Sequence, residues 1–376
     1  MRRWTFVLAL VIGLLALVAC AAEEKATPAP TAPGAQSKPA WEQEWERVLA
    51  AAKQEGKVVV LGPPGAQYRE AFIDNFEKKY GIRVEFLGGS GSELAARMKA
   101  ERAAGQYLWD VQIHGTTTAV GDLTASGIAD QIKPALILPE VTDTKNWRDG
   151  RLDFADKAES HNLVFFGSPK VMVVYNKSMV DPNEIKTYRD LLNPKWKGKI
   201  TSQDPRMAGA GLATFTFYYL YYGEEYVKEL LNQNLMLSRD VRQVVEWVAQ
   251  GRAAMAIGPN EDFTKAFIDQ GAPLGVIEVL ENRGYLTSAW GSVTLLNRSP
   301  HPNAAKIYIN YILSKDGQTA LSKASGYLSR RTDVPIEAIA EWSKIRPNVN
   351  YDTTNYKEDV VMRKDEIATI IGKYLQ

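Results

Sequence analysis

The sequence contains one cysteine and three histidines among its 376 residues. A single cysteine excludes a disulfide within the chain. No histidine or cysteine has a partner at the spacing that zinc sites need, so we expect neither a metal nor another cofactor. The formal net charge is +1 and no block of basic residues occurs, which argues against a nucleic-acid partner.

Long apolar runs are also scarce, and the most prominent one lies at the N-terminus. Two arginines precede the apolar run 6–18, which leads into Leu-Val-Ala-Cys20. The run is shorter than the roughly 20 residues that cross a bilayer, and small residues before a cysteine are typical of a lipoprotein signal peptide. We predict that residues 1–19 are removed and that Cys20 is lipidated. The alternative is an ordinary signal peptide with an incidental cysteine.

The segment 20–40 is rich in Ala, Pro, Thr, Gln and Lys and has no apolar period, which predicts a disordered tether. Together with a lipid on Cys20, this tether would hold the folded part outside the cytoplasm, in the periplasm or at the cell surface, anchored to the cell membrane. No second run of 18 apolar residues follows, so we expect no other membrane span.

From Trp41 onward, β-branched runs alternate with segments of helical spacing. Strands are expected at 57–61, 82–87 and 110–113, and each is followed by a helical pattern. This alternation predicts an α/β fold with parallel sheet. Ligands of such sheets lie beyond the carboxyl ends of the strands, so the turns at these ends are the candidate binding loops.

A second set of elements begins near Phe165. The expected strands include 171–176 and 253–257, and an amphipathic helix is expected at 240–251. Further helices follow near the C-terminus, at 303–313, 318–324 and 361–374. The two sets predict two α/β lobes.

Several sequence blocks resemble the extracellular solute-binding proteins of ABC importers, with the greatest likeness to the group that includes the ferric-iron binders. The blocks are Glu55–Val60, Phe76–Ile82, Glu101–Tyr107, Val174–Asn176, Gly251–Ile257, Ser299–Lys306 and Leu313–Gln318. They stand in the same order as in that family and extend over nearly all of the chain after Trp41.

The resemblance implies a two-lobed type 2 periplasmic-binding-protein fold, with a mostly parallel sheet flanked by helices in each lobe and two hinge crossovers. By position, the crossovers are expected near 165–169 and 288–294. The first lobe would then combine 41–165 with the returning segment 293–376 and its C-terminal helices, and the second lobe would be 166–292. The implied protein is a monomer that captures a small-molecule solute and delivers it to the subunits of an ABC permease, without enzymatic activity.

Two turns of the first lobe carry candidate solute contacts. Ser90-Gly91-Ser92 joins a strand to a helix, so its hydroxyls and free amides suit a carboxylate or phosphate oxygen. A plain helix N-cap, or the nucleophile elbow of a hydrolase, is the alternative for this turn. His114-Gly115-Thr116 occupies the same place after the next strand, although a lone histidine is often structural.

Candidates in the second lobe gather on two further turns. Asp204 is expected to cap a helix that Pro205 begins, with Arg206 free to pair with an anionic solute and Gly209 allowing close backbone approach. Asn260 and Glu261 follow a strand and can accept hydrogen bonds from hydroxyls or amines. These groups leave open whether the solute is anionic or cationic.

Aromatic side chains are the remaining candidates. Tyr175 ends a strand, and Tyr285 and Trp290 lie near the second crossover, so all three are expected to line the cleft, with core packing as the alternative. The adjacent tyrosines that ferric-binding relatives carry after the strand 253–257 are replaced here by Asn260-Glu261-Asp262-Phe263. The tyrosines at 218–222 have helical spacing and are expected to pack.

These observations favour a small polar organic solute. The alternatives are ferric iron or a ferric chelate bound by the same fold, a secreted hydrolase that uses Ser90, and a sensory binding protein that serves a receptor.

Overall fold

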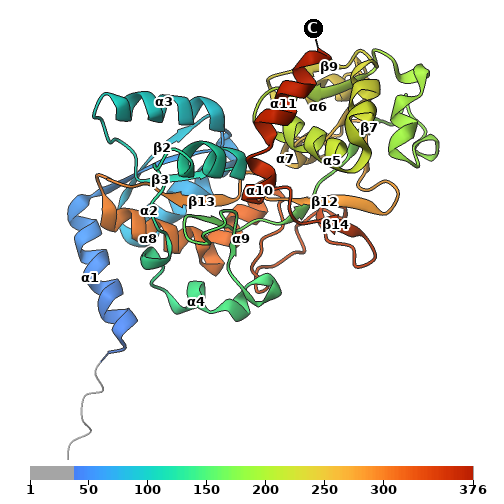
Figure 1. The fold of residues 1–376 in the computed structure, drawn as a ribbon. Coiled ribbons are helices and arrows are strands. Elements are labelled where there is room, and N and C mark those ends of the chain that lie inside the picture. The colour runs from blue at the N-terminus through green and yellow to red at the C-terminus, as the bar shows by residue number, and fades with distance from the viewer. Residues whose placement is uncertain (1–37, 376) are drawn as a thin grey trace, which may run out of the picture. The chain divides into compact units, whose positions relative to one another are not determined.

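The computed structural model describes residues 38–375, and the chain from Pro39 onward forms one compact unit (Figure 1). The predicted signal peptide, Cys20 and most of the predicted tether lie outside the described residues. The first helix, α1 (Ala40–Glu55), begins one residue before Trp41, where the alternating pattern starts in the sequence. Between residues 38 and 375, no helix has the length and apolar character that a membrane crossing requires.

The first lobe is built on a six-stranded sheet with the order β2-β1-β3-β13-β5-β4. β1 pairs in parallel with β2 and β3, whereas β13 is antiparallel to β3 and to β5. The strands are β1 (Lys57–Gly62), β2 (Arg83–Gly88), β3 (Val111–His114), β4 (Asp153–Phe154), β5 (Asn162–Val164) and β13 (Ser292–Leu295). The sheet is therefore mixed rather than mostly parallel, because β13, which returns from the second lobe, and β4 run opposite to the other four strands.

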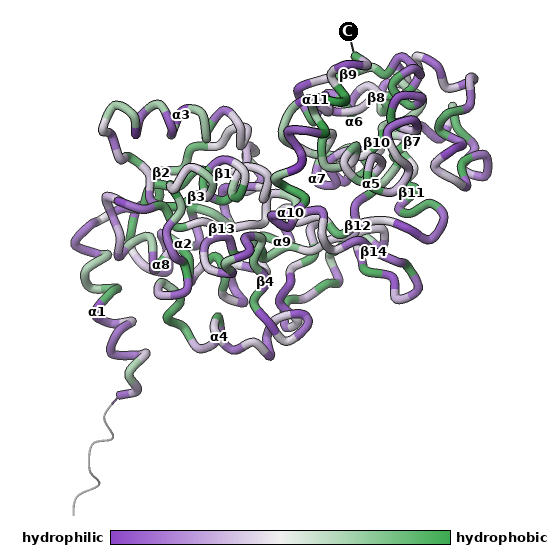
Figure 2. Tube along the Cα trace, in the orientation of Figure 1, coloured by the Kyte–Doolittle hydropathy of each residue, from purple (hydrophilic) through white to green (hydrophobic). Residues whose placement is uncertain are grey.

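Both faces of this sheet are buried, as the continuous apolar run of β1 indicates. Val58 and Val60 belong to one core with residues of α1 and of the helices α2 and α8, while Val59 and Leu61 face a second core with α3. Figure 2 shows hydrophobic residues along these central elements. The helices of this lobe are α2 (Asn75–Tyr80), α3 (Gly91–Ala103), α4 (Pro139–Thr142), α8 (Pro302–Leu313), α9 (Lys315–Ser325) and α10 (Glu358–Val361).

The second lobe repeats this design with a five-stranded sheet in the order β11-β7-β10-β8-β9. Met255 and Ile257 of β10 face a core with α5, while Ala256 between them faces a core with α6. The elements are β7 (Val173–Asn176), β8 (Ile200–Gln203), β9 (Met236–Ser238), β10 (Met255–Ile257), β11 (Leu274–Ile277), α5 (Ala210–Leu231), α6 (Val241–Ala249) and α7 (Glu261–Asp269).

Two crossovers connect the sheets, and they lie side by side. The outgoing segment contains β6 (Ser168–Pro169) and the returning segment contains β12 (Arg283–Thr287), which pair antiparallel; β14 (Asn350–Asp352) adds to β12 in parallel. The first crossover coincides with the expected 165–169. The second begins earlier than the expected 288–294, because β12 belongs to it and Ser292 already pairs in the first sheet.

The C-terminal helix departs from expectation. We expected the whole segment 293–376 to return to the first lobe, but α11 (Lys364–Lys373) packs on α5 of the second lobe (Figure 1). Ile367 and Ile371 are fully buried in the same core as Phe215 and Tyr218. Their spacing of four residues places both on one helix face, and the second lobe supplies the apolar surface that this face needs.

Candidate functional site

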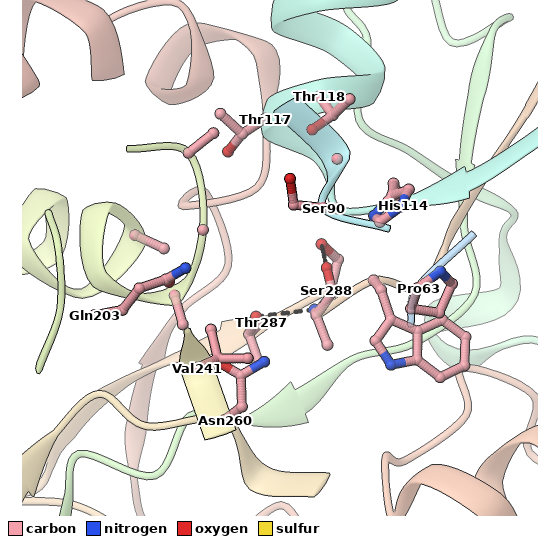
Figure 3. A pocket seen from close by; sticks show the side chains of 18 of the residues that line it. Pro63, Ser90, His114, Thr117, Thr118, Gln203, Val241, Asn260, Thr287 and Ser288 are labelled. Atoms are coloured by element: carbon pink, nitrogen blue, oxygen red, sulfur yellow. Dashed lines mark hydrogen bonds between the residues drawn. The ribbon is translucent and has the colours of Figure 1, made fainter. Parts of the chain in front are cut away.

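A cavity of about 490 Å³ lies where the carboxyl ends of the first-lobe strands meet turns of the second lobe. Pro63 and Ser90 come from the turns after β1 and β2, His114 and Gln203 are the last residues of β3 and β8, and Asn260 lies in the turn after β10 (Figure 3). Residues 287–290 of the returning crossover complete the lining. A cavity of this size at the ends of parallel strands has the dimensions of a small-molecule site.

The turn after β2 begins helix α3, and Ser90 is its N-cap. The Ser90 hydroxyl accepts a hydrogen bond from the Glu93 amide at 3.3 Å. Gly91 starts the helix at a close approach, since a β-carbon there would lie 2.4 Å from Thr118 Oγ1 and 3.3 Å from His114 Nδ1. Ser90 and Gly91 line the cavity, whereas Ser92 does not.

The turn after β3 places His114, Gly115 and Thr116 in the lining, and the adjoining Thr117 and Thr118 join them. Figure 3 shows Thr117 and Thr118 on the same side of the cavity as Ser90. Burial lowers the pKa of His114 to about 4, so its ring is neutral at pH 7. Its Nε2 has no hydrogen-bond partner among the residues that the structure describes. His114 therefore contributes an uncharged side chain to the lining, with its Nε2 buried.

Glu261 lies in the lining but is already paired. It is 2% exposed, and its Oε1 lies 3.0 Å from Nζ of Lys170 and accepts the Val171 amide at 2.9 Å. Asp262, the next residue, accepts a hydrogen bond from the Tyr68 hydroxyl at 2.6 Å, and burial raises its pKa. These carboxyl groups are therefore engaged by protein groups, which weakens the expectation that Glu261 binds a cationic solute.

Asn260 directly precedes Glu261 and lines the cavity, and it has a buried acceptor without a partner in the described chain. It precedes α7 without using its side chain as a cap, and its Oδ1 has no partner within residues 38–375. Asn260 and Val241 face Ser90 and the two threonines across the cavity in Figure 3. Because this oxygen is buried, the Asn260 side chain must rotate before a solute hydroxyl or amine can supply the missing hydrogen bond.

Asp204 and Arg206 do not line the cavity, which differs from expectation. The Arg206 guanidinium donates to both carboxylate oxygens of Asp204, at 2.9 and 2.7 Å, and lowers the pKa of that carboxyl. Asp204 caps only a local turn, because α5 starts later, at Ala210. The expected helix start at Pro205 was wrong, and the two charges satisfy each other.

Gly209 and Gln203 line the cavity where Asp204 and Arg206 were expected. Gly209 has φ +151°, and a β-carbon there would lie 2.5 Å from Gln203 Oε1, so only glycine fits without strain. The same oxygen accepts the Gly211 amide at 3.1 Å. The glycines thus allow the close backbone approach that the sequence indicates, with a glutamine side chain as the neighbour.

The aromatic candidates divide. Tyr285 and Trp290 line the cavity, whereas Tyr175 packs in the second-lobe core against Gly275. The Tyr285 hydroxyl lies 3.0 Å from that of Thr214, and burial raises the pKa of this phenol. Tyr218 is fully buried and does not reach the cavity, in line with the packing role expected for the tyrosines of α5.

Several lining residues were missed in the sequence. They include Lys170, Gln203, Arg239, Thr287, Ser288, Tyr327, Tyr356 and Lys364. Gln203 directly precedes the turn of Asp204, Pro205 and Arg206, which the sequence marks as a candidate binding loop. The same reasoning could therefore have included Gln203. The sequence around Lys364 has no pattern that indicates a binding residue. Lys364 lines the cavity because α11, which it begins, crosses to the second lobe.

The chain matches the model of the bacterial extracellular solute-binding proteins over residues 71–347, and it belongs to this family. An uncharacterized protein of Haemophilus influenzae is 24% identical over 322 residues, which is 82% of this chain and 88% of that protein. Iron uptake protein A1 of Synechocystis is 28% identical over 127 residues, 33% of this chain and 31% of that protein. The family membership that the sequence blocks predicted is confirmed.

Solved structures show the same fold. The substrate binding protein of an ABC transporter from Agrobacterium tumefaciens has a TM-score of 0.69 at 16% identity, covering 88% of this chain and 97% of that one. The periplasmic binding protein AfuA from Actinobacillus pleuropneumoniae, with fructose-6-phosphate bound, gives 0.68 at 18% identity over 85% and 98%. Iron-bound HitA from Pseudomonas aeruginosa gives 0.65 at 17% over 85% and 99%. The predicted two-lobed fold is confirmed.

Proposed function

We propose that this protein captures a small polar organic solute in the cavity and delivers it to the permease of an ABC importer, making and breaking no bond. The observation that carries the proposal is the cavity of about 490 Å³, lined by strand ends of both lobes and by the returning crossover. Its lining presents hydroxyls, amides and aromatic faces, which fix the orientation of a polar ligand.

The two adjacent crossovers suit hinge closure. The short segments β6 and β12 connect the sheets, the chain between α10 and α11 crosses between the lobes once more, and Ala289 next to β12 has φ +47°. Bending there would bring Asn260 toward Ser90 and enclose the solute. A closed form that differs from the empty one gives the permease a surface to distinguish.

The remaining parts of the proposal concern the location of the protein. A lipid on Cys20 and the tether 20–40 would keep a monomer outside the cytoplasm and close to the membrane-embedded permease. Labelling with a radioactive fatty acid tests the lipid, and a Cys20→Ser variant should lose both the label and membrane association.

The test of solute capture is a thermal-shift screen of residues 39–376, the unit that contains the cavity and its cores. The panel contains sugars, sugar phosphates, carboxylates, phosphonates, polyamines and ferric salts. A solute at 100 times its Kd should stabilise the protein by about 2.7 kcal/mol. No stabilisation by any member, together with no solute in protein isolated from cells, would refute capture.

Asn260→Ala shows whether the binding occurs in this cavity. The variant should weaken solute affinity about tenfold, because it removes the unpaired Oδ1. The free energy of unfolding should stay equal or rise, since that oxygen has no described partner in the protein. The matched control is the exposed Asn232→Ala, which should change neither quantity.

Ferric iron or a ferric chelate is the second candidate, because iron-binding proteins occur among the similar structures. The lining tyrosines 285, 327 and 356 all have pKa values raised by burial, which disfavours the phenolate form that binds Fe(III). No group of three or more His, Cys, Asp or Glu residues in the described chain could hold a metal ion. A visible phenolate-to-iron absorption band on adding ferric citrate would favour this candidate.

A further inference from the structure

Lys364 brings a buried positive charge to the cavity. Its side chain is 2% exposed and belongs to the lining. Nζ donates one hydrogen bond, to Thr117 Oγ1 at 3.2 Å. No carboxylate lies within 4.0 Å of this nitrogen among residues 38–375. A buried ammonium normally has a direct ionic partner, whereas Lys364 has, in the described chain, only the more distant charge of Asp352.

Every other buried cation or anion of the lining has a protein partner. Lys170 is paired with Glu261 at 3.0 Å, and Asp262 is hydrogen-bonded to Tyr68 at 2.6 Å. Asp240 is exposed and caps α6 through the Arg242 amide. Arg239 and Glu93 also line the cavity and form no ion pair among residues 38–375, but both are exposed to solvent. Among the buried charges of the described lining, the one without an ion pair is therefore that of Lys364.

Further donors surround this charge. Thr117 lies next to Thr118, whose Oγ1 is close to the start of α3, since a β-carbon on Gly91 would approach it to 2.4 Å. The amides of Gly91 and Ser92 lie in the first turn of α3, where N–H groups have no partner inside the helix. The His114 side chain, only 7% exposed, also lines the cavity. Ammonium, hydroxyl and helix-start amides are the donors that oxyanions bind.

We infer that the solute carries an oxyanion, either a phosphate monoester or a carboxylate, and that Lys364 binds it together with Thr117 and the first turn of α3. This inference rests on the proposed function, and it decides the charge of the solute. Burial lowers the pKa of Lys364 to about 8, with Asp352 as the charge that opposes this shift. An oxyanion next to Nζ would raise that pKa and offset the burial.

The primary probe is inorganic phosphate. Fructose 6-phosphate, fructose, citrate and spermidine are tested separately as further ligands. Thermal shift and calorimetry are carried out on residues 39–376 as wild type and as Lys364→Met. Lys373→Met, an exposed lysine on the same helix, is the matched control. Phosphate stabilises proteins generally by exclusion, and the comparison of the variants cancels that effect.

We expect phosphate to bind to the wild type and to Lys373→Met at concentrations up to about 50 mM, and Lys364→Met to weaken this binding roughly ten- to a hundredfold. The ligand-free Lys364→Met protein should melt at a higher temperature than wild type, because the variant removes a buried charge. Fructose 6-phosphate should bind at least tenfold tighter than fructose if the anion is a phosphate. A preference for citrate would identify a carboxylate instead.

Equal affinities of Lys364→Met and wild type for the anions overturn the inference, and so does a wild type that binds none of phosphate, fructose 6-phosphate and citrate. If fructose or spermidine binds and Asn260→Ala weakens that binding, the inference falls while solute capture stands. If no compound of any charge binds, both proposals fall.

Discussion

Lys170 and Glu261 form an ion pair of 3.0 Å, with both side chains at most 3% exposed. Lys170 follows β6 on the outgoing crossover, and Glu261 is the first residue of α7 in the second lobe. Glu261 also accepts the amide of Val171 at 2.9 Å. The pair therefore attaches the hinge to the wall of the cavity.

Lys170→Met should reduce the free energy of unfolding by about 3–5 kcal/mol, because it leaves a buried carboxylate without its cation. In combination with Glu261→Gln, the loss should be smaller than the sum of the two single changes. Urea unfolding followed by tryptophan fluorescence measures both. The control is Lys195→Met in the exposed pair with Glu184, which should cost at most about 1 kcal/mol. Full additivity of the buried pair would contradict the interpretation.

Gly91→Ala should destabilise the protein by about 1–3 kcal/mol, because the new methyl group would lie 2.4 Å from Thr118 Oγ1. It should also weaken solute binding, since Thr118 must move within the lining. Thr118→Ala in the same chain should restore most of the stability. Gly372→Ala on α11 has open space around it and should stabilise by up to about 1 kcal/mol. Chemical denaturation compares the three variants with the wild type, and a neutral effect of Gly91→Ala would show that the close approach relaxes freely.

Stability should depend on pH through His114. Its pKa is about 6.5 in an unfolded chain and is lowered to about 4 by burial. Between these values the unfolded state binds more protons than the folded one, so the free energy of unfolding falls as the pH is lowered from 6.5 to 4. The loss attributable to this residue is at most about 3 kcal/mol.

His114→Gln removes this titration. Its free energy of unfolding should fall less between pH 7 and pH 4 than that of the wild type, as urea titrations at a series of pH values would show. His161→Gln serves as the control at a histidine outside the cavity. Parallel curves for wild type and His114→Gln would argue that the folded His114 titrates near its ordinary pKa.

Ile371→Ala should cost about 2–5 kcal/mol, because the side chain is fully buried between α11 and the second-lobe core. Amide exchange should then increase in α5 and not in α8, since α5 is the helix that α11 covers. Glu366→Ala on the exposed face of α11 is the control and should change stability by less than about 0.5 kcal/mol. Faster exchange in α8 would instead favour the first-lobe location that the sequence suggested.

Local patterns predicted much of the cavity. Ser90 and His114 directly follow apolar strands, and the carboxyl ends of parallel strands meet at one edge of a sheet, so their convergence needed no tertiary information. The turn after β10, with Asn260 and Glu261, was predicted to line the cavity for the same reason. The chemistry of that turn could not be predicted, because the partner of Glu261 is Lys170, a residue 91 positions earlier on another segment.

The sequence by itself determined the α/β class, the family and the strand-end turns, since these depend on residue periodicity and on contiguous blocks. Only the tertiary structure decided which charges remain unpaired. It neutralised Asp204 with Arg206 and Glu261 with Lys170, and it carried α11 to the second lobe, so that Lys364 reaches the cavity beside Thr117. Charge pairing in a buried site depends on distances of a few ångströms between segments that are remote in the chain, and no local pattern encodes these distances.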